Sequence, residues 1–228
     1  MVLIDSLIEE GWLKTPGIIE AFQKIKRVDF LPEDIKDLAE LNEALPIGDG
    51  QTISQPLVVA FMLEQLQPEP GDKVLDIGSG SGWTTALLAE IVGEKGRVFA
   101  IEIIPELVEF GKKNVEKYNF VEKGIVEFIL ADGSKGYPNM SSRPELAEGF
   151  DKILASASAR EIPQAWKEQL KVGGRIVTPV GSSIWLLIKK SPPFAKATEG
   201  KEKPTVPVGE FEEYEYPGFA FVPLITEK

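Results

Sequence analysis

One stretch of the sequence decides the fold: Val74-Leu75-Asp76-Ile77-Gly78-Ser79-Gly80-Ser81-Gly82. It opens on a short apolar run, which is typical of a buried strand, and continues into three glycines at alternating positions. Glycine permits a tight turn and lets a ligand approach the backbone without a Cβ atom in the way. Because residues 84–92 then have the pattern of a helix, the sequence predicts a ligand-binding turn between a strand and a helix.

Strand and helix patterns alternate along the chain around this turn. Strands are expected over residues 74–77, 98–101, 125–130, 152–155 and 175–177, and helices over residues 56–67, 84–92, 106–118 and around 163–170. Such alternation predicts crossover units in a mostly parallel sheet. The predicted fold class is therefore α/β, a Rossmann-like doubly wound and mostly parallel sheet with helices on both faces and an N-terminal helical cap.

The same patterns divide the chain into three parts. Residues 1–55 predict the N-terminal helical cap, with amphipathic segments over residues 4–13 and 18–25 and a turn-rich end. Residues 56–190 form the expected core. Residues 191–228 are expected to hold an inserted polar loop over 191–216 and a returning final strand over 219–224, and a second polar loop is expected over 139–149.

The glycine loop does not match two common nucleotide-binding motifs. A dinucleotide fingerprint counted from Gly78 and Gly80 would place Trp83 where a small residue is needed for close helix–strand packing. A P-loop needs a Gly-Lys-Ser/Thr run, and the sequence has none. The order that is present, an acid followed by glycines at alternating positions, resembles motif I of class I S-adenosylmethionine-dependent methyltransferases.

Three acidic residues are expected at the carboxyl ends of successive strands, where open α/β sheets bind ligands. By this resemblance, Asp76 would meet the ammonium group of the methionine part of the donor, and Glu102 would accept both ribose hydroxyls. Asp132, with Gly133 beside it, is similar to the position that contacts the adenine edge. Each residue alone is also typical of an ordinary turn or strand end, so the prediction depends on their order along successive strands.

A second stretch narrows the family: Leu45-Pro46-Ile47-Gly48-Asp49-Gly50-Gln51-Thr52-Ile53-Ser54-Gln55-Pro56 resembles the signature segment of protein-L-isoaspartate O-methyltransferases. The resemblance spans nearly the whole chain outside the two polar loops. It implies that Ser54 is the active-site residue and that S-adenosylmethionine is the methyl donor. The donor pocket that it implies is formed by Gln51, Thr52, Ile53, Asp76, Gly78, Ser79, Gly80, Gly82, Glu102, Ile103, Asp132 and Gly133.

The composition suits the activity that this resemblance implies, methyl transfer to the free carboxylate of isoaspartyl residues in damaged proteins. The chain has no His and no Cys, which excludes Ser-His-Asp and Cys-His catalysis. No metal site is expected, although carboxylates alone can bind Mg²⁺ or Ca²⁺. A carboxylate with an ordinary pKa near 4 is ionised at pH 7 and needs no general base. Ser54 would then orient the substrate or the donor; alternatively, it only caps the helix that begins near Pro56.

The charge balance bears on the partners of the protein. With 25 basic and 36 acidic residues the net charge is −11, which argues against binding to a nucleic-acid backbone. It therefore argues against the alternative enzyme, a tRNA adenine N1-methyltransferase; the other alternative is a degenerate methyltransferase fold that acts as a binding module. The sequence shows no signal-peptide pattern and no run of about 18 apolar residues. We therefore expect a cytoplasmic protein without membrane or nucleic-acid partners, and a monomer.

Overall fold

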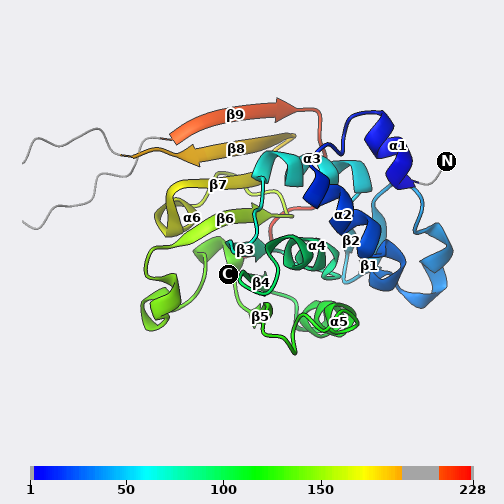
Figure 1. Ribbon diagram of the computed structural model, residues 1–228, viewed down its shortest axis with the longest axis horizontal. Helices are drawn as coiled ribbons and strands as arrows, with labels where there is room; N and C mark the ends of the chain where they lie inside the picture. Colours follow the sequence, from blue (N-terminus) through cyan, green and yellow to red (C-terminus); the bar gives the residue numbers. More distant parts are fainter. Residues whose placement is uncertain (1–2, 192–210, 227–228) are drawn as a thin grey trace, which may run out of the picture.

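The computed structural model describes residues 3–191 and 211–226. Its main feature is a seven-stranded sheet in the order β5-β4-β3-β6-β7-β8-β9 (Figure 1). The strands are β3 (Lys73–Ile77), β4 (Arg97–Glu102), β5 (Val126–Leu130), β6 (Phe150–Ala155), β7 (Leu170–Val180), β8 (Ser183–Lys189) and β9 (Phe211–Pro217). Strands β5, β4, β3, β6 and β7 are parallel neighbours, whereas β8 is antiparallel to both β7 and β9. The predicted doubly wound, mostly parallel sheet is confirmed.

Helices cover both faces of the sheet, as predicted. They are α1 (Leu3–Glu9), α2 (Pro16–Lys24), α3 (Pro56–Leu66), α4 (Trp83–Val92), α5 (Pro105–Glu116) and α6 (Gln164–Gln169). Successive side chains of a strand point to opposite faces of the sheet. Val74 and Val98 therefore lie in one core with α1 to α5, whereas Leu75 and Phe99 lie in a second core with Trp166 of α6. The sheet is thus buried on both faces, which explains the continuous apolar runs of its strands. Among the described residues, no helix is long and apolar enough to cross a membrane.

A short hairpin lies between the N-terminal helices and the sheet, and the sequence patterns did not predict it. Strands β1 (Leu45–Gly48) and β2 (Gln51–Ile53) pair antiparallel. The turn between them is Asp49-Gly50, with φ of 52° and 71°. Two successive residues at positive φ are the requirement of a tight hairpin turn, for which Asp-Gly is a preferred pair. The residues predicted only as turn-rich therefore form a defined support for Ser54.

The C-terminal part of the chain requires a correction. Strand β9 forms over Phe211–Pro217 and not over residues 219–224, and β8 was also missed. Gly218 takes a φ of 100° directly after β9, and residues 219–224 make only an isolated bridge between Pro223 and Ser158. Proline has no N–H to donate to a strand ladder, which disfavours a strand there. Of the predicted polar loop over 191–216, residues 192–210 lie outside the described residues.

The polar loop over residues 139–149 is irregular, as expected, but it is not simply a solvated excursion. It contains two short 3₁₀ helices, η4 (Met140–Ser142) and η5 (Pro144–Leu146). Leu146 is fully buried in the core of Phe99 and Phe150. Met140 packs against the same core, so apolar side chains anchor a loop whose composition is mainly polar.

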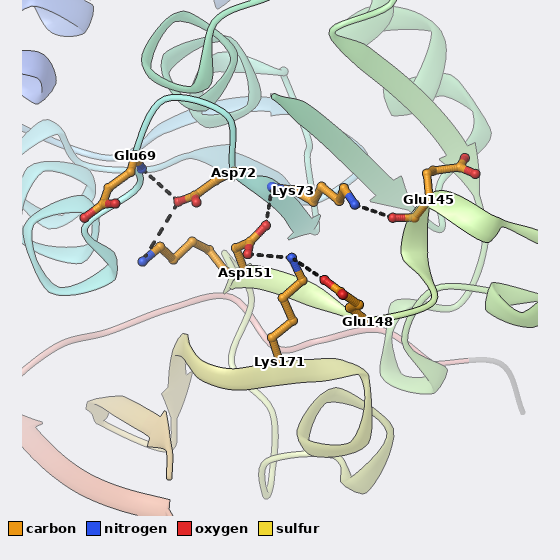
Figure 2. A network of polar contacts seen from close by, with 8 residues as sticks. Glu69, Asp72, Lys73, Glu145, Glu148, Asp151 and Lys171 are labelled. Atoms are coloured by element: carbon orange, nitrogen blue, oxygen red, sulfur yellow. Dashed lines mark hydrogen bonds and ion pairs between the residues drawn. The ribbon is translucent and has the colours of Figure 1, made fainter. Parts of the chain in front are cut away.

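A network of ion pairs and hydrogen bonds joins the amino ends of β3, β6 and β7 (Figure 2). Asp151 is its centre: Oδ2 accepts a hydrogen bond from the Lys73 backbone N–H at 2.8 Å, and Oδ1 lies 2.8 Å from Lys171 Nζ. Lys171 also lies 3.8 Å from Glu148. The network sits at the end of the strands opposite to the glycine loop, so its role is to hold strand ends together.

We therefore expect Asp151→Ala to lower the free energy of unfolding by about 1–3 kcal/mol, the cost of leaving hydrogen-bonding groups without partners. Asp151→Asn keeps a carbonyl oxygen that can accept from the Lys73 N–H, so it should lose less. Denaturant unfolding followed by circular dichroism measures both. Equal stability of Asp151→Ala and the parent protein would contradict this role.

Candidate active site

A cleft opens at the carboxyl ends of β3, β4 and β6. Its empty volume is about 720 Å³, including space open to solvent. β3 lies between β4 and β6, so the direction of winding reverses at this point of the sheet. Open α/β sheets place their ligands at such a reversal. The cleft is lined by residues 51–54, 77–81, 83–84, 101–104, 107, 131, 133, 156–157 and 222–225.

The structure brings together most of the site residues that the sequence predicted. Ten of them line the cleft: Gln51, Thr52, Ile53, Ser54, Gly78, Ser79, Gly80, Glu102, Ile103 and Gly133. Three others, Asp76, Gly82 and Asp132, are not in its lining. All three are adjacent in sequence to lining residues.

The glycine loop is held against α5 by direct backbone contact. Gly82 has a φ of 83°, and a Cβ atom there would lie 2.8 Å from the Gly111 carbonyl oxygen. The Asn114 side-chain amide, which is buried, donates to the Ser81 carbonyl at 3.0 Å. Since only glycine tolerates both the conformation and the approach, these residues explain why the loop ends in a glycine although Gly82 does not face the cleft.

Glu102 is the carboxylate of the cleft. It is 7% exposed. Its Oε1 accepts hydrogen bonds from the backbone N–H groups of Ile103 (2.8 Å) and Ile104 (3.1 Å), and its Oε2 accepts from Gly80 N–H (3.0 Å). These donors fix the carboxylate in place. A carboxylate offers about four acceptor positions, so Glu102 keeps capacity for a ligand hydroxyl.

Asp76 lies beneath the glycine loop and is fully buried. Thr85 Oγ1 donates to its Oδ2 at 2.6 Å, whereas its Oδ1 has no partner among the described residues. Burial raises the pKa of Asp76 to about 7; the Thr85 hydrogen bond lowers it and the charge of Glu102 raises it further. The structure therefore places this acid behind the loop, buried and outside the lining of the cleft, and its contact with the donor ammonium group stays a prediction.

Asp132 and Gly133 form a turn at the end of β5 that a buried tryptophan supports. The Asp132 carboxylate accepts from the N–H and the hydroxyl of Ser134 at 3.0 and 2.6 Å. The indole N–H of Trp166 donates to the Gly133 carbonyl at 2.8 Å. A Cβ atom on Gly133 would lie 2.5 Å from the Ile77 side chain. The turn is thus fixed close to β3, and a small residue is required there.

Ser54 follows β2 and is half-buried at the edge of the cleft. The alternative that it only caps the next helix is wrong: the N-cap of α3 is Gln55, without a side-chain cap. The first N–H of that helix, from Leu57, is instead accepted by the Asn42 side chain at 3.0 Å. Within the described part of the chain, no hydrogen bond of the Ser54 hydroxyl is present, so it is available to a ligand.

The cleft has a wall that the predicted site residues did not include. Ser156 and Ala157 follow β6, and residues 222–225 pass beside them. Ser158 N–H donates to the Val222 carbonyl at 2.8 Å, and Leu224 N–H donates to the Ser158 carbonyl at 2.8 Å. The position of Ser156 at a strand end could have indicated it from the sequence. Nothing in the sequence pattern indicates that residues 222–225 return to this strand end.

The charge of the cleft is negative. Among its lining residues, all within the described part of the chain, Glu102 has the only ionisable side chain. The nearby buried Asp76 adds a second acid. The same described residues contain no group of three or more acids placed to hold a metal ion. This lining suits a cationic small molecule with hydroxyl groups, which is the chemistry of S-adenosylmethionine.

Comparisons with known proteins agree with this geometry. The family model described as "Protein-L-isoaspartate(D-aspartate) O-methyltransferase (PCMT)" matches residues 1–209. A protein-L-isoaspartate O-methyltransferase of Methanopyrus kandleri is 40% identical, over 99% of this chain and 91% of the relative. The protein-L-isoaspartate O-methyltransferase of Pyrococcus horikoshii is 42% identical, over 98% of this chain and 91% of that relative.

A solved structure shows that the fold is shared as well. It is a candidate enzyme of the same kind from Plasmodium falciparum, in complex with S-adenosyl-L-homocysteine, and it superposes with a TM-score of 0.81. The match covers 99% of this chain and 97% of that one, at 21% identity, and so concerns the fold. From the family model and the two relatives, the chain belongs to the protein-L-isoaspartate O-methyltransferase family.

Proposed function

We propose that the chain transfers a methyl group from S-adenosylmethionine to the free carboxylate of isoaspartyl residues in damaged proteins and so initiates their repair. Family membership supports the activity and the methyl donor. The observation that carries the proposal is the cleft itself, in which the glycine loop, Glu102 and the Ser54 segment meet. The two alternatives, a tRNA adenine N1-methyltransferase and a binding module, are not favoured by the family match.

The residues of the cleft fit the donor. Glu102 would accept one ribose hydroxyl rather than both, since its carboxylate is fixed by three backbone N–H groups and keeps about one free acceptor position. The glycine loop gives the methionine part access to backbone. Gly133 and Ala131 leave room beside Ile101 for a flat ring. When bound, S-adenosylmethionine supplies an electrophilic methyl group.

On the acceptor side, the chain has to orient the substrate and exclude water. A substrate carboxylate with an ordinary pKa near 4 is ionised at pH 7 and can attack the methyl carbon without a general base. Ser54 would donate a hydrogen bond to this carboxylate or hold the donor in line. Ser54 would not act as a nucleophile, because no histidine is present to activate it. Alignment of the reactants alone can supply about 7–11 kcal/mol of the barrier reduction.

The chemical step would leave the isoaspartyl residue as a methyl ester. Methoxide leaves from the ester more readily than oxide would from the free carboxylate. The next backbone nitrogen can therefore attack the ester carbonyl and release methanol to give a succinimide, and hydrolysis of that ring at its β-carbonyl restores an aspartyl residue. The remaining expectations, a monomer in the cytoplasm that does not bind nucleic acid, stay predictions. The net charge of −11 supports the last of them.

Methyl transfer to matched peptides tests the proposed function. The protein is incubated with radiolabelled S-adenosylmethionine and two peptides that differ only in one isoaspartyl or aspartyl residue, and a third reaction contains tRNA. We expect label on the isoaspartyl peptide alone. Equal labelling of both peptides, or labelling of the tRNA only, would contradict the proposal.

Ser54→Ala is expected to lower kcat by about 10- to 100-fold, since a hydrogen bond to a charged group contributes about 1.5–3 kcal/mol. Stability should change little, because the hydroxyl has no hydrogen bond within the described part of the chain. Steady-state kinetics and S-adenosylhomocysteine affinity separate the two effects. Ser142→Ala, on turn η4 outside the cleft, is the matched control. An unchanged kcat in Ser54→Ala would remove Ser54 from the mechanism.

A further inference from the structure

Arg27 is a buried cation that the proposed mechanism does not use. It opens the 3₁₀ helix η1 (Arg27–Phe30) in the N-terminal cap and is 6% exposed. Among the described residues, no carboxylate lies within ion-pair distance of it. Burial lowers the pKa of its guanidinium to about 10, with Glu40 opposing this change, so the group is charged at neutral pH.

The guanidinium of Arg27 is held instead by backbone carbonyls. Its Nη1 donates to the carbonyl oxygens of Ala39 (3.1 Å) and Leu41 (2.9 Å), and its Nη2 donates to those of Glu43 (2.7 Å) and Ser54 (3.3 Å). Burying a charge without a partner of opposite charge is costly. An apolar side chain would fill the same space at lower cost, so what Arg27 adds is the fixing of these four carbonyls.

These carbonyls connect the N-terminal cap to the active site. The turn that supplies three of them also holds the chain just beyond Ser54, because the Asn42 carbonyl accepts from the Gln55 side chain at 2.9 Å. On its other side, the guanidinium carbon lies 5.4 Å from the centre of the Trp83 ring, a cation–π contact. Trp83 and Ser54 both line the cleft but come from different elements. Arg27 therefore touches two walls of the cleft from behind.

We propose that Arg27 is a positioning residue for methyl transfer: its guanidinium fixes the backbone of Ser54 relative to Trp83, so that the Ser54 hydroxyl meets the reacting groups in line. The inference rests on the proposed function, since it assumes that Ser54 acts in the cleft. A misplacement of about 1 Å can cost 100-fold in rate. Loss of the carbonyl contacts should therefore lower kcat far more than it lowers donor affinity, which depends on Glu102 and the glycine loop.

Two substitutions of Arg27 test this role on the full-length protein. Arg27→Met removes all four hydrogen bonds and should lower kcat for an isoaspartyl peptide by at least about tenfold. Arg27→Lys keeps the charge, but an ammonium group has only three donors for four carbonyls, so a smaller loss of about three- to tenfold is expected. The dissociation constant of S-adenosylhomocysteine should change by less than about threefold in both.

Tyr118→Phe is the matched control for a purely structural effect. The Tyr118 hydroxyl accepts from Lys26 N–H at 2.9 Å and donates to Asp29 at 2.6 Å, on both sides of Arg27 in sequence. Its removal loosens the same part of the cap without touching Ser54. All variants are assayed at a temperature at which circular dichroism shows them folded, and Tyr118→Phe should keep its kcat.

The outcomes separate this inference from the proposed function. An inactive parent protein would contradict the function itself. If the parent is active and the kcat values of Arg27→Lys and Arg27→Met both lie within twofold of the kcat of Tyr118→Phe, the proposed role of Arg27 is overturned. Should Arg27→Met not fold, Arg27→Lys decides alone: a lower kcat at unchanged donor affinity supports positioning, and a parent-like kcat overturns it.

Discussion

Replacing Glu102 with alanine is expected to weaken the binding of S-adenosylhomocysteine by about 100-fold. The carboxylate would lose its hydrogen bond from a ribose hydroxyl, worth about 1.5–3 kcal/mol because the acceptor is charged. The variant also leaves the N–H groups of Gly80, Ile103 and Ile104 without their acceptor. The loop that carries Gly80 would then be less well ordered for the ligand.

Isothermal titration calorimetry with S-adenosylhomocysteine measures this effect without need of a peptide substrate. Glu102→Gln keeps the shape and one acceptor oxygen, but its amide NH₂ group would face backbone donors, so an intermediate loss is expected. Glu106→Ala removes an exposed acid from the first turn of α5 and is the matched control. Parent-like affinity in Glu102→Ala would remove Glu102 from the donor site.

The sequence was sufficient to predict the parts of the site that depend on local pattern. The glycine loop and Glu102 follow apolar runs that can only be buried strands of a parallel sheet, so their placement at one edge follows from the fold. Their positions in the cleft agree with that expectation. No periodicity in the sequence marks a short hairpin of this kind. The site residues around Ser54 were therefore predicted only from the resemblance of their segment to a family signature.

What the sequence could not show depends on contacts between distant segments. Asp76 reads as a ligand contact in the motif, but the packing of α4 over β3 buries it completely and gives it Thr85 as partner. Arg27 belongs to no motif in the sequence, and only the folding of residues 39–43 around it reveals its carbonyl partners. Strand β9 was missed because it is an edge strand with three glutamates. Glutamate is depleted in strands, so the β-forming residues Phe211, Tyr214 and Tyr216 gave no clear strand pattern.

Asp76 should make the stability of the protein fall as the pH rises from about 4 to about 7. Its pKa in the folded protein is about 7, against an ordinary value near 4 when the chain is unfolded. Between these values the folded state binds more protons than the unfolded state, so the free energy of unfolding decreases with pH. Below pH 4 the carboxyl is neutral in both states, and above pH 7 the full cost of the buried charge is present.

The size of this contribution is about 4 kcal/mol over the whole window, at about 1.4 kcal/mol for each pH unit. Other carboxylates also titrate in this range, so the quantity to measure is the difference between the parent protein and Asp76→Asn. The amide has nearly the same shape and its oxygen can still accept from Thr85, but it carries no charge. Asp76→Asn should therefore gain stability relative to the parent as the pH increases. Urea unfolding of both proteins at test points of about pH 4.5, 5.5, 6.5 and 7.5 measures this difference.

A second variant tests the cause of the effect. The Thr85 hydroxyl favours the charged form of Asp76, so Thr85→Val should raise the pKa of Asp76 further and extend the loss of stability above pH 7. In the Asp76→Asn background the same Thr85→Val change should leave the pH dependence unaltered. If the difference in unfolding free energy between the parent and Asp76→Asn does not change with pH, Asp76 is hydrated or paired in solution. The acid would then be accessible from the cleft, and a direct contact with a ligand ammonium group would again be the better interpretation of motif I.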